Sequence, residues 1–360
     1  MTAGAKLRGT PAPGADLLRA RAARSGEQKD SNTPMHRVGF ISPFLAAVLS
    51  GLASDGKAQD YPAHPVTLVA PYAAGGGADL VARLLAQKLG IRLGQSFVVE
   101  NRLGAGGVIA ANSVAKSAPD GYTLFLGTST QLAIQVTLHK KLPYDPVTDF
   151  APIALIASVP FVLIVHPSLG VSSLAQLIAL AKARPGQLSF GSSGVGGPPH
   201  LYTELLKMMT GIEMTHVPYK GTAQAINDLV AGHVPILFCD LAPAVPLIRN
   251  GRAVALGISS ATRFVTIPDV PPIAEAGAPG FDAVAWLMLV APAHTQGAIV
   301  DKVHAETGAV VGSAEVRQRL VDLGVTPINS PLPADLIPYV KTEVARWGQV
   351  VQHAGLAGSE

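Results

Sequence analysis

The sequence predicts an α/β protein of more than one domain, and three observations indicate it. Short apolar runs of strand length alternate with stretches of helical period along most of the chain, as in parallel sheets covered by helices. Glycine-rich turns follow several of these runs. The length of 360 residues exceeds that of one typical domain, and 14% charged and 5% aromatic residues fit α/β architecture rather than disorder.

The first unit of this pattern is a strand, a glycine-rich loop and a helix. The strand is predicted over Val66–Ala70, and three consecutive glycines follow at Gly75–Gly77. The helix is indicated by apolar residues at helical spacing: Val81, Leu84, Leu85 and Leu89. The first turn of a helix has amides without intrahelical partners, and glycine lets a ligand approach the backbone, so this unit suits an anion. A tight connection that binds nothing is the alternative.

Two further strands are predicted in the first half of the chain, over Ser96–Glu100 and Thr123–Leu126. The loop Gly127–Gln131 follows the second of them at its carboxyl end, where ligands bind in open α/β sheets. Phe161–Val165 is an apolar strand between two prolines, and we interpret it as a crossing point between lobes.

The design of the first unit recurs further along the chain. After a helix predicted over Leu174–Ala183, the strand Leu188–Phe190 leads into the loop Gly191–Gly197, which adds two serines. A helix begins near Pro199, where proline is tolerated because its missing N–H would have had no partner.

A third version of the unit comes directly afterwards. The strand Thr215–Val217 leads into the turn Pro218–Gly221, and Thr222 is placed as a helix N-cap. The strand Ile236–Phe238 then runs into Asp240, which we expect at a strand end.

The last third of the chain reads as two strands and two helices. Strands are predicted over Val254–Ser259 and Ala285–Val290, the second as a crossing back, and helices over Ala298–Leu323 and Pro333–Val351. Three charged residues of these helices are assigned to a solvated face: Arg317, Arg319 and Glu343.

The net charge of +3 originates in the first 60 residues, which hold eight Lys/Arg and five Asp/Glu. The remainder is neutral, and it lacks the clustered positive charge that a nucleic-acid partner would require.

Residues 35–58 have the layout of a secretory signal peptide, with a short basic start, an apolar stretch over Val38–Leu52 and a polar end with small residues. The apolar stretch is short for a membrane span. We expect export to the periplasm with a mature chain that begins near Gln59. Translation is expected to start at Met35, which makes residues 1–34 a misassigned extension. A buried helix is the alternative.

Motifs for nucleotide binding and nucleophilic catalysis are incomplete or absent, including the phosphate loop, the dinucleotide fingerprint and the nucleophile elbow. His200 and Glu204 stand four apart but lack a third metal ligand. Asp79 fits a helix-start acid better than a catalytic carboxylate, and Lys220 suits an anion or a solvated turn equally. The single cysteine, Cys239, is assigned to the core. We therefore expect neither an enzyme nor a cofactor.

Five segments, taken together, resemble the periplasmic substrate-binding proteins of tripartite tricarboxylate transporters, the Bug family. They are PYAAGGGADLVARLLAQKLG, VENRLGAGGVIAANSVAKSAPDGYTL, FGSSGVGGPPHL, HVPYKGTAQAINDLVAGHV and IPDVPPIAEAGAPGF. The resemblance covers essentially Tyr61 to Leu356.

The resemblance implies a two-lobed periplasmic-binding-protein type II (Venus flytrap) fold, each lobe a mostly parallel sheet flanked by helices. The first lobe would comprise 61–165 plus 283–360 and the second 166–282. It also implies a monomer that binds a small mono-, di- or tricarboxylate for the permease subunits of a tripartite tricarboxylate transporter or for a sensor protein.

Carried over position by position, the resemblance places the ligand between the loops of the two lobes. In the first lobe it implies contacts from Tyr72, Ala74, Gly75, Gly76, Gly77, Thr128 and Thr130. In the second it implies contacts from Ser192, Ser193, Gly194, Gly197, Gly221, Thr222 and Asp240.

Two departures from the family pattern concern the expected ligand contacts. Gly197 stands where family members usually have Ser, so one hydroxyl contact is missing, and the first loop reads Tyr-Ala-Ala where Pro-Pro is common. Backbone donors carry little side-chain information, so the residues do not name the ligand.

Two other functions stay open at this point. One is a cytoplasmic doubly wound α/β enzyme that uses the glycine loops for a nucleotide cofactor, which would require residues 35–58 to be an ordered helix. The other is the effector-sensing domain of a regulator, for which the chain lacks a basic helix-turn-helix segment.

Overall fold

The computed structural model describes residues 61–360, all of which belong to one compact unit of the chain, Ser54–Glu360. The predicted signal peptide and the extension before it lie outside the described residues. Within residues 61–360, no helix combines the length and the apolar character that crossing a membrane requires.

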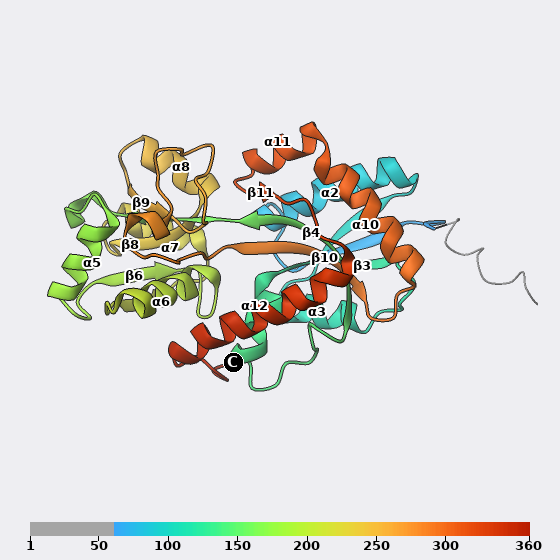
Figure 1. Ribbon diagram of the computed structural model, residues 1–360, viewed down its shortest axis with the longest axis horizontal. Helices are drawn as coiled ribbons and strands as arrows, with labels where there is room; N and C mark the ends of the chain where they lie inside the picture. The colour runs from blue at the N-terminus through green and yellow to red at the C-terminus, as the bar shows by residue number, and fades with distance from the viewer. Residues whose placement is uncertain (1–60) are drawn as a thin grey trace, which may run out of the picture. The chain divides into compact units, whose positions relative to one another are not determined.

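The first of two sheets has six strands in the order β11-β4-β10-β3-β1-β2 (Figure 1). Its parallel part is β1 (Val66–Ala70) between β2 (Phe97–Asn101) and β3 (Thr123–Thr128). The other strands pair antiparallel: β10 (Ala285–Pro292) with β3 and with β4 (Phe150–Val159), and β11 (Thr326–Pro327) with β4. The predicted strands of this half are confirmed within two residues at each end.

Six helices belong to the first lobe among the residues that the structure describes. They are α2 (Gly77–Leu93), α3 (Val108–Ala115), the short α4 (Gln135–Leu138), α10 (Gly297–Gly312), α11 (Ala314–Asp322) and α12 (Pro333–His353). A 3₁₀ turn, η1 (Ala105–Gly107), precedes α3, and a π-helical turn, η2 (Thr130–Ile134), precedes α4. The prediction of a single helix over Ala298–Leu323 was wrong, because Ser313 interrupts it. The Ser313 side chain accepts the amide of Val316 and caps α11.

The second sheet has five strands in the order β7-β6-β8-β5-β9. Strands β6 (Ser189–Ser192), β7 (Thr215–Pro218) and β8 (Ile236–Asp240) are parallel, whereas β5 (Phe161–Val165) pairs antiparallel with β8 and β9 (Val254–Ile258). Around it lie η3 (Pro167–Leu169), α5 (Leu174–Ala183), α6 (Pro198–Thr210), α7 (Thr222–Val230), α8 (Leu241–Arg249) and α9 (Ile273–Ala276). The two-lobed α/β class is confirmed, with parallel pairing confined to one half of each sheet.

The chain passes between the sheets at β4 and β5, which only Pro160 separates (Figure 1). Strand β5 is buried throughout and pairs with β8 and β9 of the second sheet, although the expected bounds placed residues 161–165 with the first lobe. The return strand, β10, is tied to this crossing through Ser259. The Ser259 hydroxyl accepts the amide of Phe161, and the Ser259 carbonyl accepts the amide of Ala283.

Helix α12 packs against β4 of the first lobe and α6 of the second. Its Trp347 stacks on Tyr202 of α6, with ring centroids 5.4 Å apart. The assignment of Glu343 to a solvated face was wrong: its side chain is buried, and its Oε2 accepts the indole N–H of Trp286 at 2.8 Å and that of Trp347 at 3.1 Å. A carboxylate is required there because two buried donors converge on one point.

We predict that Glu343→Ala lowers the free energy of unfolding by about 2–4 kcal/mol, since two buried indole N–H groups lose their acceptor. Glu315→Ala, which removes an exposed ion pair with Lys88, is the control and should cost less than about 1 kcal/mol. Urea denaturation of both variants measures the difference. Equal losses would contradict a structural role for Glu343.

Candidate functional site

Three loops of the first lobe meet at the carboxyl ends of β1, β2 and β3, and the side chain of Gln131 joins them. Its Oε1 accepts the amide and the hydroxyl of Thr128, at 3.0 and 2.8 Å. Its Nε2 donates to the hydroxyl of Tyr72 at 3.1 Å and to the carbonyl of Gly106 at 2.6 Å. The Thr128 hydroxyl in turn accepts the amide of Thr130. The structure thus brings the predicted residues Tyr72, Thr128 and Thr130 together.

Asp79 and Asn101 fix the glycine loop before α2. Asn101 donates to the carbonyl of Tyr72 and to Asp79 Oδ1, both at 2.8 Å, while Asp79 Oδ2 accepts from the amide of Gly75 and from Arg83. Burial acts to raise the pKa of Asp79, but these hydrogen bonds outweigh it and lower the pKa. Asp79 is therefore a charged, buried anchor in the first turn of α2, as the helix-start interpretation expected.

The start of α2 presents backbone donors at this edge. The first intrahelical bond runs from the amide of Leu80 to the carbonyl of Gly76, so the amides of Gly77, Ala78 and Asp79 precede it. Residues 73–77 are exposed. Of the predicted glycines, Gly75 has its amide occupied by Asp79, which leaves the helix start as the donor group.

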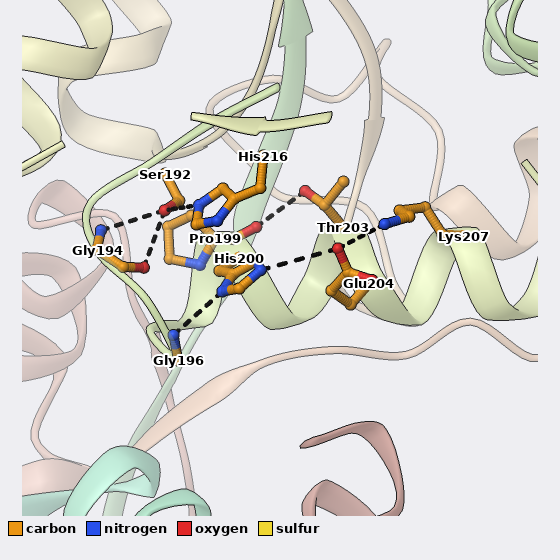
Figure 2. A network of polar contacts seen from close by, with 9 residues as sticks. All are labelled: Ser192, Gly194, Gly196, Pro199, His200, Thr203, Glu204, Lys207 and His216. Atoms are coloured by element: carbon orange, nitrogen blue, oxygen red, sulfur yellow. Dashed lines mark hydrogen bonds and ion pairs between the residues drawn. The ribbon is translucent and has the colours of Figure 1, made fainter. Parts of the chain in front are cut away.

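In the second lobe, the loop Ser192–Gly197 joins β6 to α6 (Figure 2). The Ser192 side chain is fully buried, and its hydroxyl lies 2.9 Å from the carbonyl of Gly194, 3.2 Å from the amide of Gly194 and 2.6 Å from His216 Nε2. Ser192, predicted as a ligand contact, is thus surrounded by internal partners. The exposed part of the loop is Val195, which follows half-buried Ser193 and Gly194 and precedes buried Gly196.

Helix α6 begins with two prolines, Pro198 and Pro199, after an extended Gly197. Since proline has no N–H, this helix start offers fewer donors than that of α2. The amides of Ser193, Val195 and Gly197 make no hydrogen bond to any residue that the structure describes. They are the donors available in this loop.

The other two predicted second-lobe positions follow β7 and β8. Gly221, not Thr222, is the N-cap of α7; Thr222 is the first helical residue, and its hydroxyl donates to Asp240 Oδ2 at 3.4 Å. Burial raises the pKa of Asp240, which ends β8 as expected. The Tyr219 amide donates to the Ser192 carbonyl, so the loops after β6 and β7 are neighbours.

One contact joins the two lobes near these loops. Gly196, with a φ of +68°, lies so close to Leu138 at the end of α4 that a Cβ at this glycine would overlap that side chain. A pocket of about 530 Å³ lies elsewhere in the first lobe, lined by residues between 136 and 149 together with Val344, and none of these was a predicted site residue. Within residues 61–360, no group of three metal-ligating side chains is arranged around a common point.

Sequence reasoning missed the side chains that hold these loops. Gln131, Asn101 and His216 lie within or beside the strands, where nothing in the spacing distinguishes them from ordinary polar residues. Gln131 stood inside a predicted loop but forms part of the buried turn η2. A glycine loop with no side chains of its own was the one available signal that neighbouring residues must support it.

Comparison with known proteins agrees with this architecture. Residues 81–356 match the family described as "Tripartite tricarboxylate transporter family receptor". Protein BugT of Bordetella pertussis is 38% identical over 316 residues, which cover 88% of this chain and 96% of that protein.

Two solved structures resemble the fold closely. R. palustris Rpa4515 with adipate has a TM-score of 0.74 and 41% identity, covering 83% of this chain and 99% of that one. MatC from Rhodopseudomonas palustris with bound malate has a TM-score of 0.70 and 36% identity, covering 81% and 100%.

The fold and the loop-lined edges define a two-lobed solute-binding receptor, not an enzyme. The chain belongs to the tripartite tricarboxylate transporter receptor family, which includes the Bug proteins.

We predict that acidification destabilises the protein through two histidines near the second-lobe loop. Burial, the neighbouring His216 and Lys207 lower the pKa of His200 to about 3, and burial and Lys207 lower the pKa of His216 to about 4. The unfolded chain protonates both rings near pH 6.5 and the folded chain does not, so lower pH favours unfolding.

For His200 this effect should reach about 2 kcal/mol between pH 7 and pH 5. Carboxylates also titrate in this range, so the measurement compares the unfolding free energy of wild type and His200→Asn across pH. The variant should lose less stability on acidification, and parallel curves would contradict the prediction.

Proposed function

We propose that this protein captures a small organic carboxylate between its two lobes and delivers it to the membrane subunits of a tripartite tricarboxylate-type transporter. The observation that carries the proposal is a set of backbone amides at the carboxyl edges of both sheets that have no hydrogen-bond partner within residues 61–360. They include those of Gly77 and Ala78 in the first lobe and those of Ser193, Val195 and Gly197 in the second.

Backbone amides of this kind suit a carboxylate for an electrostatic reason. The start of α2 carries the positive end of a helix dipole, and a carboxylate can accept several N–H groups at once. The first lobe edge adds the hydroxyls of Tyr72 and Thr128, and the second adds those of Ser193 and Thr222. Gly197 supplies no hydroxyl, so second-lobe recognition relies more on the backbone.

The relatives support the ligand class. One similar protein has been solved with adipate and another with malate, and both are dicarboxylates of small size. Delivery to a permease follows from the family, whose description is that of a transporter receptor. We further propose that the chain is exported to the periplasm, as the composition of residues 35–58 predicts.

Carboxylate binding predicts a ligand-dependent rise in melting temperature. A ligand at 100 times its Kd stabilises the folded protein by about 2.7 kcal/mol. We expect adipate, malate or a tricarboxylate such as citrate to raise the Tm, and the uncharged diamide of adipic acid to leave it unchanged. A panel of mono-, di- and tricarboxylates in which no member shifts the Tm would contradict the proposal.

A single amide donor can be removed by Gly77→Pro. Gly77 is the first residue of α2, a Cβ there meets nothing within 4 Å, and the preceding Gly76 has the extended φ and ψ (−75°, 163°) that proline requires. The variant should raise the Kd of the carboxylate about tenfold or more, because a hydrogen bond to a charged acceptor contributes about 1.5–3 kcal/mol.

Gly297→Pro is the matched control. Gly297 also begins a helix, α10, after an extended residue and with open space at its Cβ, but it belongs to no predicted loop. It should leave the Kd unchanged, as isothermal titration calorimetry can show. Equal affinity of both variants and wild type would remove the start of α2 from the site.

A further inference from the structure

We infer that two stacked histidines, His200 and His216, set the shape of the second-lobe loop Ser192–Gly197 and thereby its affinity for a carboxylate. They are positioning residues, because they act through the loop backbone. This inference rests on the proposed function, which assigns the loop to the ligand site.

The two rings hold the loop at two separate points (Figure 2). The amide of Gly196 donates to His200 Nδ1 at 3.1 Å, and His216 Nε2 lies 2.6 Å from the hydroxyl of Ser192. That hydroxyl also bonds to the amide and the carbonyl of Gly194. One histidine therefore fixes Gly196 and the other fixes Gly194 through Ser192, on either side of the exposed Val195.

The geometry also specifies which nitrogen of each ring carries a proton. A backbone N–H can only donate, so His200 Nδ1 is unprotonated and its proton is on Nε2. The Ser192 hydroxyl has one hydrogen, and every partner is satisfied when it donates to the Gly194 carbonyl and accepts from Gly194 N–H and from His216 Nε2–H. His200 is then neutral, and burial together with Lys207 lowers the pKa of His216 to about 4, so that ring is neutral at pH 7.5 as well.

The surroundings keep the rings neutral and parallel. Their centroids are 3.7 Å apart with planes at 13°, and Phe190 packs beside the pair, with its ring centroid 5.0 Å from that of His216 and 6.0 Å from that of His200. The charged groups facing the pair come from α6: Lys207 is ion-paired to Glu204 at 2.7 Å, and Glu204 Oε1 lies 3.8 Å from His200 Nε2. A proton added to either ring would place a positive charge near Lys207, and protons on both rings would place two positive charges against each other.

The backbone of the loop has an unusual conformation that needs such support. Gly194 and Gly196 have φ values of +141° and +68°, which other residues rarely adopt, and the two prolines that follow remove the amides that would extend the helix backwards. Of the five amides in residues 193–197, the two that are hydrogen-bonded are those held by Ser192 and His200. The remaining three, those of Ser193, Val195 and Gly197, have no partner within residues 61–360 and are the ones available to a ligand.

The test distinguishes the role of the acceptor atom, His200 Nδ1, from that of the aromatic ring. His200→Phe keeps a ring for the stack but has no acceptor, whereas His200→Asn places an amide oxygen near the position of Nδ1. His64→Asn, at an exposed histidine beside the amino end of β1, is the control. Hydrogen exchange of the segment 191–200 is measured without ligand, and the Kd for adipate and for malate is measured by calorimetry at pH 7.5.

We expect His200→Phe to speed exchange at Gly196 and to raise the Kd about tenfold. His200→Asn should restore slow exchange and bring the Kd to within about threefold of wild type, and His64→Asn should change neither. The ¹⁵N shifts of the His200 ring should identify the Nε2–H tautomer. If His200→Phe fails to fold, His216→Phe, which removes the donor at the second anchor, takes its place, and His216→Gln, which keeps a donor near Nε2, serves as its rescue.

Unchanged exchange in His200→Phe would overturn the positioning role, and faster exchange with an unchanged Kd would overturn its link to affinity. If wild type binds no carboxylate while exchange responds as expected, the proposed function fails, and the claim about affinity fails with it. The claim about loop shape would then still be supported by exchange alone.

Discussion

Under the proposed function, glycine-rich loops of both lobes offer backbone amides to a ligand, and because such loops have few side chains to hold their own shape, buried polar side chains hold them. In the first lobe the buried amide of Gln131 joins Tyr72, Thr128 and the Gly106 turn, and Asp79 holds Gly75. In the second lobe two histidines and Ser192 hold the equivalent loop. Gln131, Asp79, Ser192 and His200 are all more than nine-tenths buried, and His216 stacks on His200. Their hydrogen bonds are therefore shielded from water and keep their geometry.

Contacts at the crossing strands and between α12 and α6 join the two lobes. Ser259 ties the two crossing segments together, because its hydroxyl accepts the amide of Phe161 at the start of β5 and its carbonyl accepts the amide of Ala283 before β10. Trp347 of α12 stacks on Tyr202 of α6. These contacts leave the carboxyl edges of the sheets free to present loops. Gly196 against Leu138 is where the second-lobe loop reaches the first lobe, so a glycine is needed there for both its φ and its lack of a side chain.

Much of the fold could be predicted because apolar runs and helical periods are local signals. Strands such as Val66–Ala70 and the helix Leu174–Ala183 were located to the residue. What could not be predicted depends on contacts between residues far apart in the sequence. Strand β5 belongs to the second sheet because its partners are β8 and β9. Glu343 is buried where it accepts a hydrogen bond from Trp286, which stands 57 positions earlier in the chain. The predicted site residues fall on two loop-bearing edges, but the anchors behind them have no sequence period at all.

Under the proposed function the two lobes contribute unlike donors, and this asymmetry has a consequence for closure. The first lobe offers the start of α2, whose dipole attracts an anion whatever the side chains do. The second offers loop amides before Pro198 and Pro199, which depend on the histidine anchors for their direction. A ligand that contacts one lobe alone binds the open and closed forms equally and cannot favour closure. Closure therefore requires the contacts of both lobes, and the second-lobe contact depends on the loop held by His200 and His216.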